Sequence, residues 1–236
     1  MPTLLLRSVA PLQAWDTQSN FSIRTTGREP TKSGIIGLLC AALGRPRTEP
    51  VDDLATLKMG VRADQEGVIL RDWHTALDVY KASGRQPAYP KHPKFTTISN
   101  RYYLSDAAFL VGLESNDRAL LETLQAALRA PHWMLFLGRK ACPPSMPVYI
   151  QNGIQESVLL TALENYPWVG MYKKRYDKLK KDNPRGVRVV LEKDDGERVH
   201  NDQPISFEKG NRQFSPRRVH VDWIDFPEFA EKEVSS

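Results

Sequence analysis

Residues 21–44 read Phe-Ser-Ile-Arg-Thr-Thr-Gly-Arg-Glu-Pro-Thr-Lys-Ser-Gly-Ile-Ile-Gly-Leu-Leu-Cys-Ala-Ala-Leu-Gly, a polar segment that runs into an apolar one. The apolar part predicts a helix over 31–43. Thr31 or Ser33 can cap its first backbone N–H groups, and Gly44 can end it. A polar loop before a core helix is typical of proteins that pack helices on a sheet.

Positive charge gathers where this helix begins. Arg24, Arg28 and Lys32 lie in or near its first turn, whose free N–H groups already attract anions. A nucleotide-triphosphate loop does not fit, because Thr26 and Thr31 stand where that loop needs glycine. We interpret the segment as a cradle for the phosphates of a polynucleotide or for another anionic partner, with an ordinary polar loop as the alternative.

The composition bounds the class of protein. The chain has 236 residues, of which 41% are hydrophobic, so it can form one large globular domain or two small ones. Its formal net charge of +5 permits a nucleic acid or an anionic protein as a partner.

Several classes of protein are disfavoured by what the sequence lacks. Cys40 and Cys142 do not have the pattern of a disulfide framework or a zinc site, and the histidines show no metal-ligand spacing. No apolar stretch has the length of a membrane span, and the N-terminus does not resemble a signal peptide. We expect a cytoplasmic protein without a metal, another cofactor or a membrane partner.

Hydrophobic patterns predict an α+β fold for a first domain over residues 1–150. The order of elements is strand, helix, hairpin, strand, helix, strand, which matches the βαββαβ ferredoxin-like arrangement of RNA-recognition domains. The hairpin is expected around the turn Asp64-Gln65-Glu66-Gly67. The predicted strands are 3–10, 58–63, 68–77, 107–114 and 133–137, and the helices are 31–43 and 118–129.

A smaller, β-rich part is predicted over residues 151–236. The turn Asp194-Asp195-Gly196 predicts a second hairpin there. The basic run 173–188 favours a solvated face, with contact to RNA or to another subunit as the alternative. The expected elements are a short helix within 156–165, strands at 187–191, 197–199 and 219–223, and a frayed end after Pro227.

The stretch 79–105 contains no acidic residue, and its prolines exclude a helix. It interleaves cations with aromatic residues, as single-stranded RNA requires for its phosphates and bases. We predict an extended, RNA-binding hairpin, with a solvated hairpin as the alternative. The cations are Lys81, Arg85, Lys91, Lys94 and Arg101, and the aromatic residues are Tyr80, Tyr89, Phe95, Tyr102 and Tyr103.

A turn at Gly138-Arg139-Lys140 follows a predicted strand and places two cations at a sheet edge, where they contact RNA or merely form a structural turn. Metal-free RNA cleavage would need a base near a 2′-OH and a cation near the phosphate. His74, or His92 beside Lys91, offers those residue types, but nothing in their spacing requires catalysis. We therefore predict no catalytic residue.

Three motifs, in this order along the chain, carry a resemblance to a known family. They are Ala-Pro-Leu-Gln-Ala-Trp at 10–15, Arg-Glu-Pro-Thr-Lys-Ser-Gly-Ile-Ile-Gly-Leu-Leu at 28–39 and Gly-Arg-Lys-Ala-Cys-Pro-Pro-Ser at 138–145. Together they resemble the CasD family of subunits of type I-E CRISPR Cascade complexes, within the RAMP superfamily. Asp16 departs from the pattern, in which glycine would follow Trp15.

The resemblance implies a ferredoxin-like domain with an inserted β-hairpin, called the thumb, at about 79–105. It implies a non-catalytic subunit that grips the 5′ repeat-derived handle of the CRISPR RNA and caps the filament of backbone subunits in antiviral defence. The expected partners are this RNA, a backbone subunit, the large subunit and, through the complex, target DNA. In the similar type I-C systems the related protein itself cuts precursor RNA, so a metal-independent endoribonuclease is the alternative.

The expected RNA contacts combine the cradle, the thumb and the turn after residue 137. They are Arg24, Thr25, Thr26, Arg28, Lys32, Ser33, Lys91, Arg101, Arg139 and Lys140.

Overall fold

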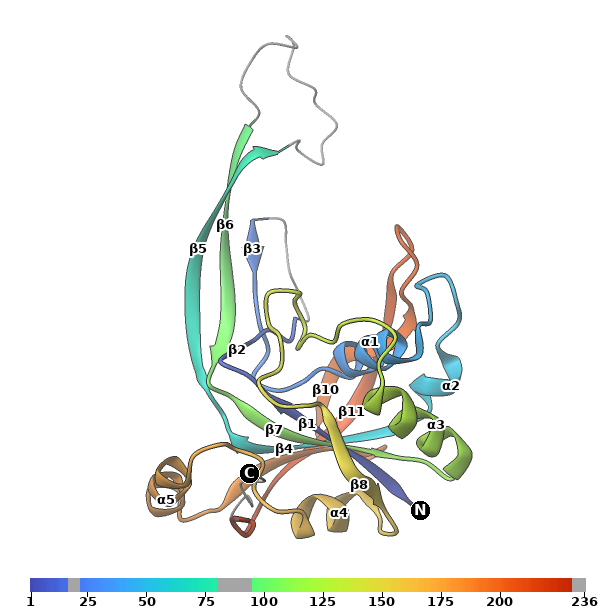
Figure 1. Cartoon of the computed structure of the whole chain (residues 1–236), viewed down its shortest axis with the longest axis vertical. Helices are drawn as coiled ribbons and strands as arrows, with labels where there is room; N and C mark the ends of the chain where they lie inside the picture. Colours follow the sequence, from blue (N-terminus) through green and yellow to red (C-terminus); the bar gives the residue numbers. More distant parts are fainter. Residues whose placement is uncertain (17–21, 80–94, 231–236) are drawn as a thin grey trace.

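The computed structural model describes residues 1–16, 22–79 and 95–230, which form two β-sheets and the helices that pack on the larger one (Figure 1). The larger sheet is antiparallel throughout and has the strand order β10-β11-β9-β4-β7-β1-β8. Its strands are β1 Thr3–Val9, β4 Lys58–Gln65, β7 Ala108–Glu114, β8 Tyr149–Gln155, β9 Val187–Glu192, β10 Arg198–Ser206 and β11 Gln213–Ile224.

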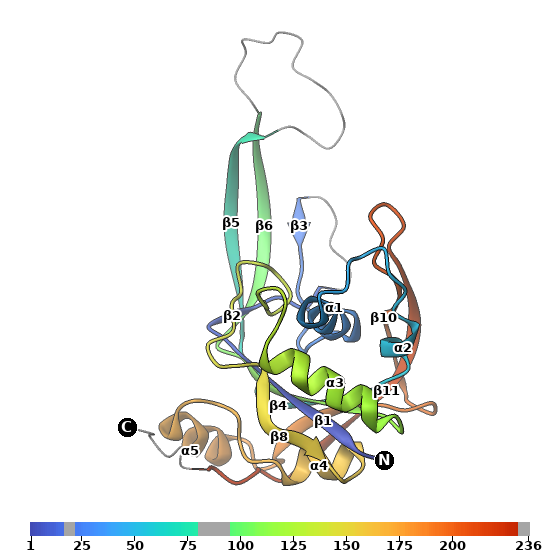
Figure 2. The same ribbon diagram turned by 45° about the vertical axis from the view of Figure 1, so that its right-hand side comes forward.

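The sheet separates two apolar cores. Successive side chains of β1 point alternately into one core and the other. Leu4 and Leu6 point into the core that contains α1 Lys32–Leu43 and α3 Arg118–Arg129. Leu5 points into the opposite core, which α4 Leu159–Asn165 covers. The helices therefore lie on both faces of the sheet, as Figures 1 and 2 show.

Both long helices begin and end close to where their sequences predict. Thr31, rather than Ser33, caps α1 by accepting a hydrogen bond from the Gly34 N–H, and Gly44 ends it with a left-handed φ of 76°. Asp117 caps α3 by accepting a hydrogen bond from the Leu120 N–H through its side chain. Runs of buried apolar residues also give β1 and β7 nearly their predicted bounds.

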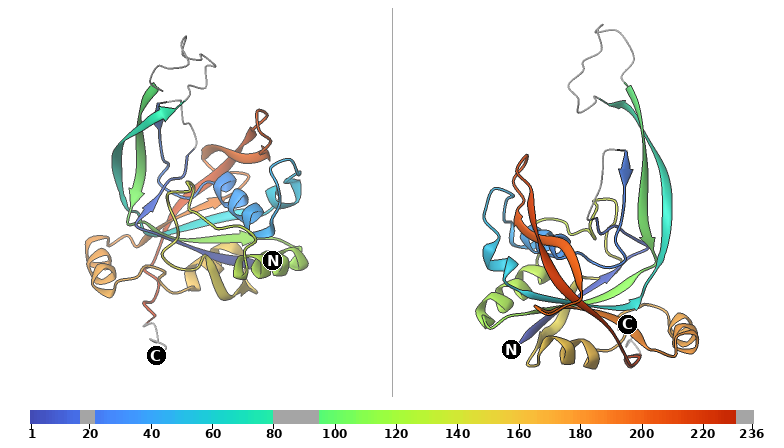
Figure 3. Two further views of the ribbon diagram at one scale, coloured as in Figure 1. Left: turned by 45° about the horizontal axis from the view of Figure 1, so that its top comes forward. Right: turned by 180° about the vertical axis from the view of Figure 1, so that it is seen from behind.

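The second sheet is built on a long hairpin that projects from the rest of the molecule (Figures 1 and 3). Its arms are β5 Val68–Val79 and β6 Phe95–Ser105, and the far edge of β6 binds β2 Leu12–Gln13 and β3 Ile23–Arg24. Residues 80–94 lie outside the described part. The described arms show that the hairpin begins at Val68, earlier than the expected 79.

The predicted hairpin around residues 64–67 is wrong, although the chain does turn there. β4 pairs with β7 and β9, whereas β5 leaves the large sheet and pairs with β6. Gly67 has a φ of 73°, and a Cβ atom there would meet the Ser105 carbonyl at 2.8 Å. The turn thus passes the chain from one sheet to the other.

The strand predicted at 133–137 is also wrong. The edge of β1 that does not bind β7 is taken by β8 instead. This segment runs back along the end of α1, where His132 and Trp133 donate backbone hydrogen bonds to the carbonyls of Ala42 and Ala41.

The predicted hairpin across residues 194–196 forms its turn but not its pairing. β11 lies between β9 and β10, so those two strands do not bind each other. The last strand is longer than the expected 219–223 because its first half, from Gln213, pairs with β10 while its second half pairs with β9.

Two short helices complete the described fold, α2 Asp52–Ala55 and α5 Lys173–Asp182. Strands on both sides of residue 150 share the large sheet, and the division of the chain into two domains stays a prediction. None of the helices in the described ranges has the length and apolar character needed to cross a membrane. The acid-rich residues 231–236 lie outside the described part.

Candidate nucleic-acid interface

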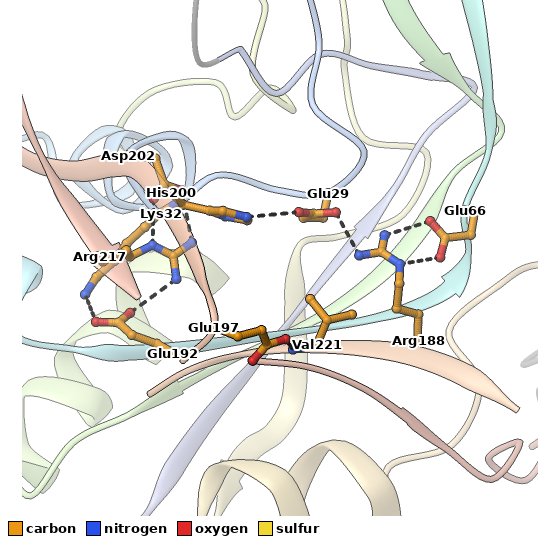
Figure 4. A network of polar contacts seen from close by, with 10 residues as sticks. All are labelled: Glu29, Lys32, Glu66, Arg188, Glu192, Glu197, His200, Asp202, Arg217 and Val221. Atoms are coloured by element: carbon orange, nitrogen blue, oxygen red, sulfur yellow. Dashed lines mark hydrogen bonds and ion pairs between the residues drawn. The ribbon is translucent and has the colours of Figure 1, made fainter. Parts of the chain in front are cut away.

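The positive, N-terminal end of α1 is already occupied by a carboxylate of the protein itself. Asp202 of β10 accepts a 2.7 Å hydrogen bond from the Lys32 backbone N–H through its carboxylate. The same carboxylate binds the Arg217 guanidinium at 2.6 and 3.0 Å (Figure 4). Asp202 is only 2% exposed, so the helix N-terminus is closed to a phosphate in this structure.

Lys32 does not present its charge to solvent either. Its amine lies 2.9 Å from a Glu192 carboxylate oxygen, and the residue is 1% exposed. Burial lowers the pKa of this amine, and Glu192 works in the opposite direction. Ser33 is half-buried on the same turn. The predicted cradle at the helix start is therefore corrected: its charges are used internally.

In the loop before α1, one charged residue forms an ion pair within the protein and its neighbour is exposed to solvent. Glu29 accepts a 2.9 Å hydrogen bond from Arg188, whose guanidinium also binds Glu66 at 2.6 and 2.7 Å (Figure 4). Arg28 is exposed and makes no ion pair with any described residue. Because Glu29 is held by Arg188, it does not neutralise its neighbour.

Two arginines that are far apart in sequence lie side by side on the second sheet. β3 runs parallel to β6, and the register places Arg24 beside Arg101. Paired residues on neighbouring strands project from the same face, so both guanidinium groups share one face. Arg24 is exposed, whereas Arg101 is half-buried and donates to Ser99 at 3.3 Å. Asp72 stands opposite Arg101 on β5 and offsets part of this charge.

Arg139 joins this face through a sharp turn. Gly138 has a φ of 87°, which points the next residue back toward the hairpin. The Arg139 guanidinium donates to the carbonyls of Tyr102 at 3.1 Å and Thr25 at 2.8 Å, and its central carbon lies 5.0 Å from the centre of the Tyr103 ring. We call Arg24, Arg101 and Arg139 the arginine row.

The predicted threonine contacts serve the loop itself. Thr26 accepts a hydrogen bond from the Trp15 N–H through its hydroxyl, and the Gly27 N–H donates to the Trp15 carbonyl. Thr25 donates its hydroxyl to Asp16 at 3.2 Å. Since Trp15 is fully buried, these bonds anchor the arginine-bearing loop to the core.

The structure thus brings together only part of the predicted set. Arg24, Arg101 and Arg139 share a surface, Arg28 and Lys140 are exposed next to it in sequence, and Lys32 is buried. Lys91 and His92 lie outside the described residues. His74 lies on β5 opposite Ser99, on the same face as Arg101.

Sequence reasoning missed the buried charges that shape this region. Arg62 and Asp64 form a fully buried pair on β4, and Arg62 also donates to backbone carbonyls after α4, including that of Pro167 at 2.9 Å. Asp202 and Arg217 form another such pair between β10 and β11. The one available signal was a charged residue at an inward position of an alternating strand.

Comparisons with known proteins identify the family of this chain. The model of the family described as CRISPR-associated protein (Cas_Cas5) matches residues 3–220. The CRISPR system Cascade subunit CasD of Escherichia coli (strain K12) is 35% identical over 181 residues, which cover 71% of this chain and 78% of CasD.

Two solved structures are similar over nearly the whole chain. A crystal structure of a Cas protein has a TM-score of 0.72 and 41% identity, and covers 96% of this chain and 98% of its own. A chain of a CRISPR RNA-guided surveillance complex has a TM-score of 0.68 and 29% identity, with coverages of 93% and 88%.

These matches define the class as CRISPR-associated proteins. Within that class, the chain belongs to the Cas5 family.

Proposed function

We propose that this protein is a non-catalytic RNA-binding subunit of a type I-E Cascade complex. In this role it holds the 5′ repeat-derived handle of the CRISPR RNA and caps the filament of backbone subunits. Support comes from the CasD relative and from the similarity to a chain of an RNA-guided surveillance complex. The expected partners are the RNA, the backbone subunit and the large subunit, with target DNA reached through the complex in the cytoplasm.

The arginine row is the observation that carries the RNA-binding proposal. Three arginines share one face near the base of the hairpin. Arg24 is exposed and can bind phosphate oxygens with two parallel donors, whereas Arg101 and Arg139 add positive charge while part of their donors bind protein oxygens. Arg28 and Lys140 add exposed charge beside them.

We assign the four strands β8-β1-β7-β4 with α1 and α3 to the ferredoxin-like class. The chain order is β1, α1, β4, β7, α3, β8, and the strands are all antiparallel. This order supports the βαββαβ assignment, with β9, β11 and β10 added at the β4 edge.

The β5–β6 hairpin, as the thumb, would contact the neighbouring backbone subunit as well as RNA. One face of its described arms carries exposed apolar side chains: Trp73 is 60% and Leu77 is 70% exposed, with Ile69 and Ile98 nearby on the same face. Exposed apolar side chains gathered in this way are characteristic of protein contacts.

Binding of handle RNA tests the proposal. Arg24→Ala with Arg28→Ala should weaken binding and lower the log–log salt slope by roughly 0.7 per lost phosphate contact. The matched control is Arg47→Ala with Arg129→Ala, which removes the same charge from exposed sites elsewhere. Equal effects in the two variants would show that Arg24 and Arg28 act only through the net charge of the protein.

Incubation of the purified protein with full-length repeat RNA in EDTA tests the absence of catalysis. We expect no specific cleavage. The competing activity would use His74, which shares a face with Arg101. A single cut at a defined position that disappears in His74→Ala would make the protein an endoribonuclease.

A further inference from the structure

α5 carries a charge arrangement that the RNA-binding surface does not use. Lys174, Lys178 and Lys181 recur at spacings of four and three residues, so they line one face of the helix. All three are exposed, and none forms an ion pair with a described residue. We call them the lysine stripe.

The opposite face of α5 fixes the helix to the protein. Tyr176 is 4% exposed, stacks edge-on against Trp168 with ring centres 5.2 Å apart, and donates its hydroxyl to the Pro227 carbonyl at 2.9 Å. Arg175 forms a 3.3 Å ion pair with Asp106 at the end of β6. The lysine stripe therefore faces solvent from a helix that is fixed to the rest of the protein.

Lys180 and Lys181 in the last turn of α5 suit the helix dipole, but the charges of its first turn do not. Lys173 and Lys174 stand in a first turn that has no acidic residue and no side-chain cap, where the helix dipole repels cations. Like charges four residues apart also repel. The acids of the helix do little to offset this, because Asp177 pairs with Lys173 and only Asp182 remains. An anionic partner would remove the repulsion.

We propose that the lysine stripe binds the phosphate backbone of a nucleic-acid duplex without reading its sequence. The stripe spans about 10 Å along the helix axis, a distance over which a duplex offers several phosphates. Lysine acts on phosphate as a point charge, without the fixed geometry of arginine. The aromatic residue of α5, Tyr176, is buried on the opposite face, so it cannot stack on bases as single-strand binding requires.

The position of α5 makes this a second site. α5 lies on the other side of the large sheet from α1, while the hairpin projects away from it (Figures 1 and 3). A duplex on the lysine stripe therefore leaves the arginine row free for RNA.

Duplex binding by the full-length protein tests the proposal. A random-sequence 20-base-pair DNA duplex and the matching RNA duplex are titrated at several salt concentrations. Lys174→Gln, Lys178→Gln and Lys181→Gln combined should weaken binding about tenfold or more and lower the salt slope by about 0.9 per lost contact. If only the DNA duplex or only the RNA duplex binds, that result identifies the kind of nucleic acid that the lysine stripe binds.

A matched variant separates the stripe from net charge. Lys58→Gln, Lys193→Gln and Lys209→Gln remove the same charge from exposed positions on strands and turns, and should leave duplex affinity nearly unchanged. Equal losses in both variants, or no duplex binding by the unmodified protein, would overturn the proposal. So would loss of duplex binding in Arg24→Ala with Arg28→Ala alone, because the duplex would then sit on the arginine row.

Handle-RNA binding is measured in parallel to keep the two proposals separate. The stripe variant should bind handle RNA like the unmodified protein, with an unchanged circular dichroism spectrum and melting temperature. Loss of RNA binding only in the arginine variant and of duplex binding only in the stripe variant supports two sites.

Discussion

Lys32 illustrates how a charge in a binding motif can be used inside the protein. Its backbone N–H binds Asp202 and its amine binds Glu192, both from strands more than 150 residues away in the chain. Breaking such a pair from one side leaves an uncompensated charge, whereas replacing both partners by apolar residues of similar volume is often tolerated. Arg217 also lies 3.5 Å from Glu192, so part of the Glu192 charge stays compensated when Lys32 is replaced.

Replacement of Lys32 therefore distinguishes a structural from an RNA-binding role. Lys32→Met should lower the free energy of unfolding by less than the roughly 3 kcal/mol expected for an uncompensated buried charge, because Arg217 also faces Glu192, and it should leave handle-RNA affinity within about twofold. Lys32→Ala should lose about 2 kcal/mol more than Lys32→Met, because it also opens a cavity. Denaturant unfolding and RNA titration measure the two effects. A large loss of affinity in folded Lys32→Met would return Lys32 to the RNA surface.

Cys40 gives a second prediction at this scale. Burial raises the pKa of its thiol from 9.0 to about 11, so the reactive thiolate is scarce at pH 8. In Cys142→Ser, which isolates Cys40, a thiol reagent should react much more slowly with the native protein than with the protein in denaturant. Equal rates would indicate that α1 opens readily.

The site could be predicted from sequence only in part, because a sequence shows charge but not its partner. The exposed arginines were predicted, and their grouping was not, since only the parallel pairing of β3 with β6 brings Arg24 beside Arg101. The sequence around α1 gives no sign that Asp202 binds the first turn of this helix. Burial of Lys32 follows from that distant contact.

At the scale of elements, local signals placed turns and helices well and strand partners poorly. Capping residues and glycines act within a few residues, so α1 and α3 were predicted within one or two positions. The turns at 64–67 and 194–196 exist, yet neither joins paired strands. Partner choice depends on burial of β4 and β9 in the sheet centre, which a turn sequence does not encode.

Gly138 offers a test of how an element positions the arginine row. A Cβ atom there would lie 1.7 Å from the Ala14 carbonyl oxygen, and its φ is 87°. Gly138→Ala should destabilise the protein and weaken handle-RNA binding, because the turn that carries Arg139 must move.

Gly210→Ala is the matched control, since Gly210 also has a positive φ, of 85°, but open space around it. It should lose only about 1 to 2 kcal/mol from backbone strain. If Gly138→Ala lowers the melting temperature no further than Gly210→Ala and binds RNA normally, the turn does not position Arg139.

At the scale of the whole molecule, the described hairpin arms add an exposed surface that the core does not need. Trp73→Ser with Leu77→Ser should change the free energy of unfolding by no more than about 0.5 kcal/mol, as is usual for exposed positions. The same variant should impair assembly with guide RNA and the backbone subunit, measured by co-purification.

Val199→Ser is the control for this variant, because Val199 is 55% exposed on β10, away from the hairpin. Normal assembly of the hairpin variant, or equal impairment of the control, would contradict a role of the hairpin in subunit contact.

The strand order also constrains how the protein is made. β4 has one edge on β7, but its other partner, β9, is translated more than 120 residues later, and β11 must then enter between β9 and β10. β1, α1 and β4 therefore emerge from the ribosome long before β9 is available to pair with the second edge of β4. Unpaired apolar edges recruit other chains, so nascent or truncated protein lacking β9 and β11 should depend on chaperones to stay soluble.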